Sequence, residues 1–244
     1  EPDFFENCTP VPEPRPGRMP RGDSMNERIY DKLKRKILFL DLQPGETIDE
    51  KKIAAEFKVS RTPIREVLQR LEWEGLVDII PRGTISVASL EYNKIKSTYF
   101  MRVHVEGLAG KLAAAYGKPM HVVRIKAVLE QITGIGGEYT PRLLIDFDAA
   151  FREILYEATG NAVLKEVSDK LYEQTVRVWL SHVQNDQTNV FLKREFEYLV
   201  EEIESAIETI EQKDRDKAEK DRKDIIIRHI KRANEYFMQD IQLY

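Results

Sequence analysis

Apolar residues recur at three- to four-residue intervals through most of the 244-residue chain after its first 24 residues, and one short stretch within that part departs from the spacing. The first helical run is Ile29, Leu33 and Ile37, which puts three apolar side chains on one face of a helix. Between residues 77 and 87, apolar and polar residues alternate on both sides of a Pro-Arg-Gly turn, which indicates a two-stranded hairpin. The pattern therefore predicts a mainly α-helical protein with one small hairpin.

The chain is long enough for two domains, and its character changes twice along the sequence. Residues 1–24 are rich in Pro, Arg and Gly and have no apolar period, so we expect a flexible leader there. Residues 25–90, called the head below, carry a dense set of cations, whereas the excess of acidic residues lies further on, in residues 91–244, the tail, as between Glu195 and Glu211. The net charge of −4 hides this asymmetry, which favours a DNA-binding head and a separate tail.

The composition is typical of a folded globular protein, with 42% apolar and 33% charged residues. The single Cys8 excludes an internal disulfide. The sequence has neither a signal segment nor an uninterrupted apolar run of about 18 residues. We therefore expect a cytoplasmic protein with no membrane partner.

Two further helices are expected between the first helix and the hairpin. Asp49 can cap the second helix. Ser60 or Thr62 can cap the third, and Gly75 ends it. The third helix has a buried apolar stripe made of Ile64, Val67, Leu68 and Leu71. Three helices followed by a hairpin make a winged helix-turn-helix.

The solvent face of the third helix carries groups that suit the major groove of DNA. Arg61, Arg65 and Gln69 follow one another at four-residue intervals, opposite the apolar stripe. Thr62 lies in the first turn, where its hydroxyl and the helix N-terminus can both meet a phosphate. Because Arg to guanine is the commonest specific contact, we expect this helix to read base edges.

Everything after residue 90 is predicted to be helical. Short breaks such as GIGG at residues 134–137 separate the segments, and such short connections favour an antiparallel bundle of six to seven helices. The expected helices span residues 91–116, 120–132, 141–158, 161–183, 189–212 and 214–239.

Four stretches of the head form a nearly continuous signature: LQPG at residues 42–45, IAAEFKVSRTPIREVLQRL at residues 53–71, EGLV at residues 74–77, and the wing glycine Gly83. In these residues the head resembles the GntR family of bacterial regulators. The resemblance implies DNA contacts by Arg61, Thr62 and Arg65, a phosphate contact by Lys51, and a minor-groove approach by Arg82 and Gly83.

Three shorter stretches lie in the tail: Arg102 with Glu106, DAAF at residues 148–151, and ATGN at residues 158–161. In these residues the tail is similar to the ligand-sensing FCD domain of the fatty-acid-regulator-like branch of the same family. That resemblance implies, for many members, a divalent metal held by one Asp and three His, the first two being four residues apart on one helix.

The metal pattern is broken in this sequence. Asp148 is present, but the residue four positions later is Arg152, which has no lone pair to donate to a metal. The next family position falls on Phe196 or Ile203, and the last on Ile225 or His229. At most two ligands remain, so we expect neither a metal nor another cofactor.

Two arginines indicate the kind of effector that the tail binds. Asp148 and Arg152 can pair in the space that a metal would fill, or form an exposed ion pair on the helix surface. Arg102 either faces the pocket, as the resemblance implies, or pairs with a structural carboxylate. Because a guanidinium fork matches a carboxylate or phosphate, we expect a small anionic organic effector. The expected pocket residues are Arg102, Asp148, Arg152, Asn161, Ile203, Ile225 and His229.

The sequence thus predicts a ligand-responsive transcriptional regulator and not an enzyme. No nucleophile-base pair or phosphate-binding glycine loop supports catalysis. The alternatives are a metal-dependent carboxylate sensor of the same family and a nonspecific architectural DNA-binding protein, which would not need so large a tail. One recognition helix covers only a few base pairs, so we expect a homodimer on a near-palindromic double-stranded operator.

Overall fold

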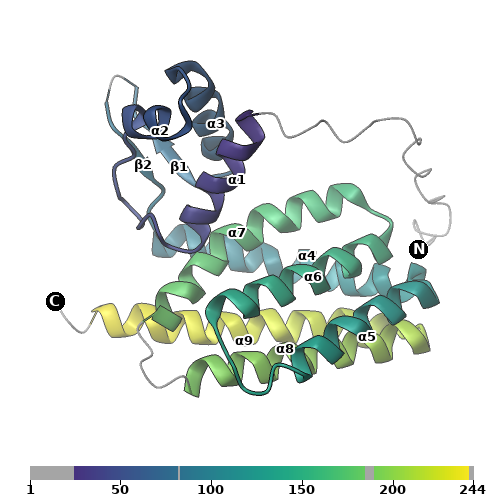
Figure 1. The fold of residues 1–244 in the computed structure, drawn as a ribbon. Helices are drawn as coiled ribbons and strands as arrows, with labels where there is room; N and C mark the ends of the chain where they lie inside the picture. The colour runs from purple at the N-terminus through teal and green to yellow at the C-terminus, as the bar shows by residue number, and fades with distance from the viewer. Residues whose placement is uncertain (1–24, 82, 185–189, 242–244) are drawn as a thin grey trace, which may run out of the picture. The chain divides into compact units, whose positions relative to one another are not determined.

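The computed structural model describes residues 25–81, 83–184 and 190–241, and in it the head consists of three helices followed by a hairpin (Figure 1). The strands pair antiparallel, with Val77 opposite Val87 and Ile79 opposite Ile85. This arrangement confirms the predicted winged helix-turn-helix. The elements are α1 (Met25–Leu38), α2 (Glu50–Phe57), α3 (Arg61–Trp73), β1 (Val77–Ile79) and β2 (Ile85–Val87).

Local hydrogen bonds and turn residues explain where α2 and α3 begin and end. The Asp49 side chain accepts hydrogen bonds from the backbone N–H groups of Lys51, at 2.8 Å, and Lys52, at 3.2 Å, as predicted for an N-cap. Ser60 is the N-cap residue of α3, although its side chain makes no capping hydrogen bond. α3 stops before Gly75, whose φ of +74° favours glycine.

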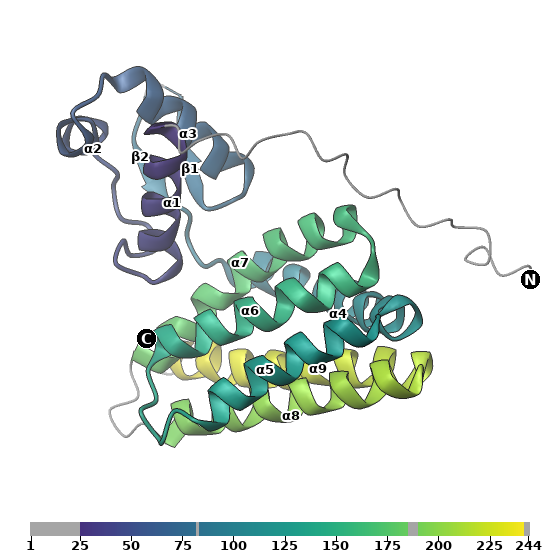
Figure 2. The same cartoon turned by 45° about the vertical axis from the view of Figure 1, so that its right-hand side comes forward.

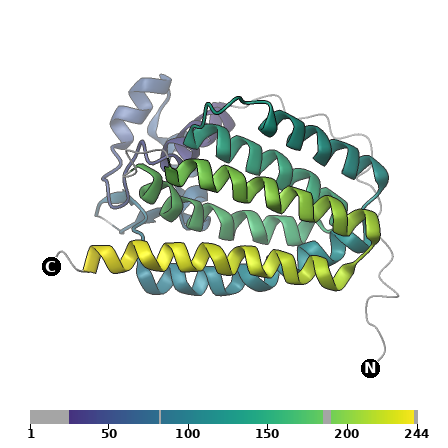
Figure 3. The ribbon, with the colours of Figure 1, turned by 90° about the horizontal axis from the view of Figure 1, so that it is seen from below.

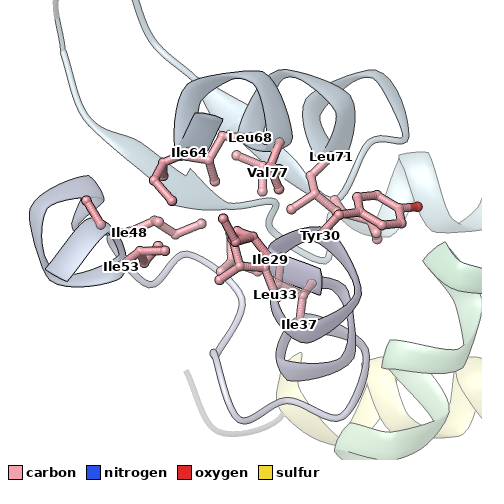
Figure 4. Packing of buried hydrophobic residues seen from close by; sticks show 14 residues of the cluster. Ile29, Tyr30, Leu33, Ile37, Ile48, Ile53, Ile64, Leu68, Leu71 and Val77 are labelled. Atoms are coloured by element: carbon pink, nitrogen blue, oxygen red, sulfur yellow. The ribbon is translucent and has the colours of Figure 1, made fainter. Parts of the chain in front are cut away.

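Every element of the head contributes to one apolar core (Figure 4). Ile29 and Ile37 of α1 and Ile64 and Leu68 of α3 are fully buried there, and Ile53 of α2 packs in the same cluster. Burying a side chain of this size contributes about 1.5 to 3 kcal/mol relative to leaving it exposed. The core therefore holds the apolar stripe of α3 against α1 and α2 and leaves the opposite face of α3 in solvent.

Six helices make up the described part of the tail, and each matches a predicted segment closely. The Thr140 side chain caps one of them by accepting a hydrogen bond from the backbone N–H of Leu143 at 3.1 Å. No described helix combines the length and the apolar character that crossing a membrane requires. The helices are α4 (Tyr92–Tyr116), α5 (Pro119–Thr133), α6 (Pro141–Thr159), α7 (Ala162–Gln184), α8 (Val190–Gln212) and α9 (Arg215–Ile241).

The chain divides into two compact units whose limits fall inside α4, α7 and α9. In the first unit, α5, α6 and α8 pack against one another (Figures 2 and 3). The boundary predicted at residue 90 stays a prediction, and the leader expected at residues 1–24 lies outside the described residues. Among the described residues, the first unit contains residues 102–168 and 190–229, and the second contains residues 25–81, 83–101, 169–184 and 230–241.

Within the first unit, α4 and α9 approach each other closely at a glycine. A Cβ atom on Gly110 would lie 2.6 Å from the backbone oxygen of Ala218 and would also overlap the Arg222 side chain. Only glycine leaves enough room for this approach. The close contact brings Arg222 of α9 against α4.

Candidate DNA-binding surface and effector site

The exposed face of α3 brings four of the predicted DNA-contact residues together. Arg61, Thr62, Arg65 and Gln69 are all exposed, whereas the apolar stripe on the opposite face is buried. Arg61 and Thr62 occupy the first helical turn, where backbone N–H groups without intrahelical partners favour an anion. Two guanidinium groups, a hydroxyl and an amide are thus exposed together on this face, and such groups can donate to phosphates and base edges.

The other head residues predicted to contact DNA lie outside α3. Lys51 is exposed in the first turn of α2. Gly83 is exposed after β1, and its N–H donates to the carbonyl oxygen of Ile80 at 2.9 Å. Arg82 lies outside the described residues. The DNA contacts of all these residues stay predictions.

Arg65 pairs with a carboxylate from α2. Its Nε donates to Oε1 of Glu50 at 2.8 Å, and its Nη2 lies 3.5 Å from Oε2. The hydrogen bond with Glu50 raises the pKa of the Arg65 guanidinium. Sequence spacing does not reveal this pair, because the two residues are 15 positions apart on different helices.

A second arginine of α3, Arg70, is held against α1. Its Nη1 donates to both carboxylate oxygens of Glu27, at 3.2 and 3.1 Å. Its guanidinium carbon lies 3.5 Å from the centroid of the Tyr30 ring, a distance at which the ring face attracts a cation. The contacts of Arg70 therefore link α3 to α1.

A polar cluster joins the head to α7. Nζ of Lys34 in α1 lies 3.0 Å from Glu74 and 2.6 Å from Glu173 of α7, and it donates to the Tyr30 hydroxyl at 2.8 Å. Burial raises the pKa of Tyr30 to about 12. Burial is the largest single effect and lowers the pKa of Lys34, but the charges and hydrogen bonds of Glu173 and Tyr30 together raise it more, so that the net change is upward. Lys34 is therefore charged at neutral pH and bridges two carboxylates.

Arg177 of α7 makes a second link to the head. Its side chain is 1% exposed, and its Nη2 donates to the backbone carbonyl oxygen of Ala88, which directly follows β2. Burial lowers the pKa of Arg177 to about 10, although the Asp78 carboxylate acts in the opposite direction. The chain that leaves the wing is thus held by a buried cation.

The tail contains a buried ion network centred on Glu106 of α4. This fully buried carboxylate accepts hydrogen bonds from Nη1 of Arg152 in α6, at 2.7 Å, and from Nη2 of Arg222 in α9. Nη2 of Arg102 lies 3.6 Å from the same carboxylate. Arg222 also donates to Glu202 of α8. The network therefore connects four helices of the tail.

Ser168 extends the network to α7. Its hydroxyl donates to Oε1 of Glu106 at 3.0 Å and accepts a hydrogen bond from Nη2 of Arg152 at 2.8 Å. The Tyr156 hydroxyl donates to Ser168, and burial raises the pKa of Tyr156. Burial also raises the pKa of Glu106, but the neighbouring arginines lower it more, so that it lies well below its usual range. Glu106 is therefore an ionised carboxylate inside the protein.

Both predicted pocket arginines have Glu106 as a carboxylate partner. For Arg152 this differs from the predicted pair with Asp148. Arg152 is 5% exposed and requires a buried anion, whereas Asp148 is half-buried. For Arg102 the structure shows the structural carboxylate that the sequence left as one of two alternatives.

The other predicted pocket residues have varied surroundings. Asn161 is exposed, and its Oδ1 accepts a hydrogen bond from the backbone N–H of Leu164 at 3.0 Å, which caps α7. Ile203 and Ile225 are buried, and His229 is half-buried. Their role in an effector pocket stays a prediction. Sequence reasoning missed Ser168, Glu202 and Arg222, whose partners are remote in the chain.

A small cavity lies beside Arg222, lined by α4, α6, α8 and α9. Its volume is about 10 Å³, which is room for about one water molecule. Two of its polar lining residues bond to each other, since the Ser205 hydroxyl donates to Oδ2 of Asp221 at 2.7 Å. An organic effector would enter this space only if the surrounding helices moved apart.

The residues of the tail do not fit the metal that the resemblance implies. Arg152 carries a buried positive charge where a ligand is needed, and both Phe196 and Ile203 are buried and apolar. In the part of the chain that the structure describes, no group of three or more His, Cys, Asp or Glu residues is placed to hold a metal.

We expect the purified protein to contain no stoichiometric zinc, nickel or manganese, because a guanidinium repels a cation and donates no lone pair. Elemental analysis measures this directly. Mild chelation is expected to leave the midpoint of thermal unfolding unchanged. One metal ion per chain, together with a loss of stability on chelation, would contradict the expectation.

The sequence and the fold both match known regulators. Residues 25–87 match the family model for bacterial regulatory proteins of the gntR family, and residues 97–231 match the model of the FCD domain. The HTH-type transcriptional regulator YdhC of Bacillus subtilis (strain 168), described as uncharacterized, is 27% identical over 179 residues, which cover 72% of this chain and 79% of YdhC. The HTH-type transcriptional repressor RspR of Escherichia coli (strain K12) is 31% identical over 91 residues, 37% of this chain and 40% of RspR.

Among solved structures, that of E. coli McbR/YncC has the same fold, with a TM-score of 0.75 and 19% identity. The match covers 88% of this chain and 99% of that chain. The FCD match alone spans more than half of the sequence, and the match to the gntR family model precedes it. This protein therefore belongs to the GntR family of bacterial transcriptional regulators and carries an FCD domain.

Proposed function

We propose that this protein is an operator-specific transcriptional regulator whose affinity for DNA is controlled by a small anionic organic effector bound in the tail. The observation that carries the DNA-binding half is the row of exposed polar side chains on α3 that includes Arg61, Arg65 and Gln69. Arginine forks and an amide at successive turns can donate to base edges, which a nonspecific architectural protein does not need. The proposal includes no catalytic step and places the protein in the cytoplasm.

The concentration of guanidinium groups around Glu106 supports an anionic effector. Arg152 and Arg222 already bind one carboxylate in the interior of the tail. An effector carboxylate would share or replace these hydrogen bonds, because a guanidinium can donate to more than one acceptor. The cavity beside Arg222 is too small for an organic molecule, so binding would require helices to move.

α7 offers a path from such a movement to the head. Its first turns carry Ser168, which bonds to Glu106, and further along it Glu173 and Arg177 bond to Lys34 and Ala88. A shift of this helix on effector binding would change how the head is held, and thereby its affinity for DNA.

Thermal unfolding in the presence of small mono- and dicarboxylates, each paired with its uncharged amide, tests the class of effector. We expect at least one acid to raise the unfolding midpoint and to change operator affinity, while its amide does neither. Mass spectrometry of molecules that copurify with the native protein provides the first candidates. A neutral ligand bound in place of an acid would contradict the anionic class, and a response that chelators abolish would favour the metal-dependent sensor.

We expect a homodimer that binds a near-palindromic operator. A base contact is worth about 1 to 3 kcal/mol, so one recognition helix does not single out a site among the millions of competitors in a genome, whereas two symmetric heads multiply the discrimination. Sedimentation at micromolar concentration gives the oligomeric state, and footprinting gives the symmetry of the protected site. A monomer that protects a single non-repeated half-site would show that this expectation is wrong.

A further inference from the structure

The pair formed by Glu50 and Arg65 has the geometry of a supported DNA-reading side chain. We propose that Glu50 is a positioning residue for specificity, which holds the Arg65 guanidinium so that its free end donates to a guanine at one position of each half-site. The inference rests on the proposed function, because it assumes that α3 reads an operator. It extends that function by assigning a role to Glu50, a residue of α2 and not of α3.

The two partners differ in exposure in the way that such a support requires. The Glu50 side chain is 16% exposed, whereas the Arg65 side chain is 65% exposed. Glu50 follows the N-cap Asp49, whose side chain binds the next two backbone N–H groups, so the main chain at Glu50 is itself well anchored. The carboxylate is thus the fixed partner, and the guanidinium reaches from it into solvent.

The hydrogen-bond geometry leaves the reading end of Arg65 available. A guanidinium has five N–H donors in a planar fork. The Glu50 carboxylate faces Nε, at 2.8 Å, and Nη2, at 3.5 Å, which form one side of the fork. The two N–H donors of Nη1 and the second donor of Nη2 are not directed at Glu50 and remain available to bind DNA. These lie at the end of the fork, which matches O6 and N7 of guanine in the major groove.

Arg61 provides the contrast. It is exposed one turn earlier on the same face of α3, and among the described residues it forms no ion pair with a carboxylate. Its flexible side chain can adapt to a phosphate or to a base, whereas Arg65 is already held before DNA arrives. Restricting a side chain in its bound geometry lowers the entropic cost of binding. An effect of Glu50 on DNA reading should therefore act through Arg65 and not through Arg61.

The sign of the Glu50 charge makes this role testable. A carboxylate close to the DNA-binding face repels phosphates, so removing it should raise the affinity for any DNA sequence. If Glu50 also positions Arg65, removing it should at the same time weaken the preference for one base. Better nonspecific binding combined with poorer discrimination is not expected of a merely structural residue.

The experiment is enrichment from a randomised DNA duplex library by the full-length protein, comparing the wild type with E50Q. In E50Q we expect the preference for guanine at one position per half-site to fall about five- to tenfold, which is within the range for loss of one bidentate contact. Affinity for random DNA should rise a few-fold. The midpoint of thermal unfolding verifies that the variant is folded.

E56Q is the matched control, because Glu56 also lies on α2 and also pairs with cations, Lys32 and Lys36 of α1. It removes the same charge without touching Arg65. We expect E56Q to raise affinity for random DNA and to keep the wild-type base preferences. If E56Q loses the same guanine preference, the effect belongs to charge alone and the proposal is overturned.

A double-substitution cycle completes the test. R65A should lose the same guanine preference as E50Q. Adding E50Q to R65A should not reduce this preference any further. Adding E50Q to R61A should still reduce it, because Arg65 is present in that variant. The proposal is overturned if E50Q selects the wild-type sequence with undiminished preference, or if E50Q lowers that preference even when Arg65 is absent. A wild-type protein that enriches no sequence would overturn the proposed function, and this inference with it.

Discussion

Replacing Glu106 by glutamine is expected to destabilise the protein by about 3 to 5 kcal/mol, the cost of removing one partner from a buried ion pair. The carboxylate is fully buried and compensates the guanidinium groups of Arg152 and Arg222, which are themselves 5% and 4% exposed. Glutamine has nearly the same shape but carries no charge. Equilibrium unfolding in urea measures the loss, which is a large share of the 5 to 15 kcal/mol typical of a folded protein.

Glu157 of α6 supplies the control for this substitution. It also pairs with an arginine, Arg124, but both side chains are more than 40% exposed. The E157Q variant is therefore expected to lose less than about 1 kcal/mol, as exposed ion pairs generally do. If E106Q loses no more stability than E157Q, the buried network contributes little to the stability of the protein.

The same network makes stability depend on pH in a defined direction. The pKa of Glu106 in the folded protein lies well below its ordinary value of 4.5. A carboxyl group whose pKa is lower in the folded than in the unfolded protein stabilises the fold. This contribution is fully present at pH values above the pKa of the unfolded state, and it is lost as the pH falls toward the pKa of the folded state. The difference in unfolding free energy between the wild type and E106Q should therefore narrow below a pH of about 4.5.

Alanine substitution of Arg61 or Arg65 is expected to cost about 1 to 3 kcal/mol of operator binding if the residue contacts a base. Both side chains are exposed on the face of α3 opposite the core, so their removal leaves the fold intact. Fluorescence anisotropy with the operator and with random DNA of the same length, at two salt concentrations, separates base contacts from phosphate contacts. A base contact lowers the ratio of the two affinities, whereas a phosphate contact lowers both affinities and reduces the dependence on salt.

Arg70 is the matched control on the same helix. Because it is bound to Glu27 and stacked on Tyr30, R70A should affect the stability of the head more than its DNA preference. A double variant R61A/R65A that binds the operator with unchanged affinity and specificity would contradict the docking of α3 on DNA.

The fold of this protein is largely predictable from its sequence, because local patterns determine its elements. The four-residue recurrence of Ile29, Leu33 and Ile37 places α1, and the side-chain oxygen of Asp49 starts α2 where the sequence predicts. The exposed face of α3 follows from the same periodicity. These features depend on neighbours within one or two helical turns.

The site in the tail is less predictable, because its partners are distant in the chain. An exposed pair four residues apart is worth only a few tenths of a kcal/mol, so the spacing of Asp148 and Arg152 is a weak guide. Glu106 reaches Arg152 across 46 residues and Arg222 across 116. Which helix faces bring them together depends on packing, and the pair of Glu50 and Arg65 was missed for the same reason.

The attachment of the head to α7 bears on how members of this family can be recombined. A designer who grafts a foreign head at residue 90 would leave Glu173 without Lys34, and Arg177 would meet a different backbone. The Ala88 acceptor is a main-chain oxygen, which any residue supplies, but its position depends on the loop around it. A working chimera would therefore exchange residues 173–177 of α7 together with the head. The unit to be exchanged is thus defined by the residues that contact the head, and not by one position in the chain.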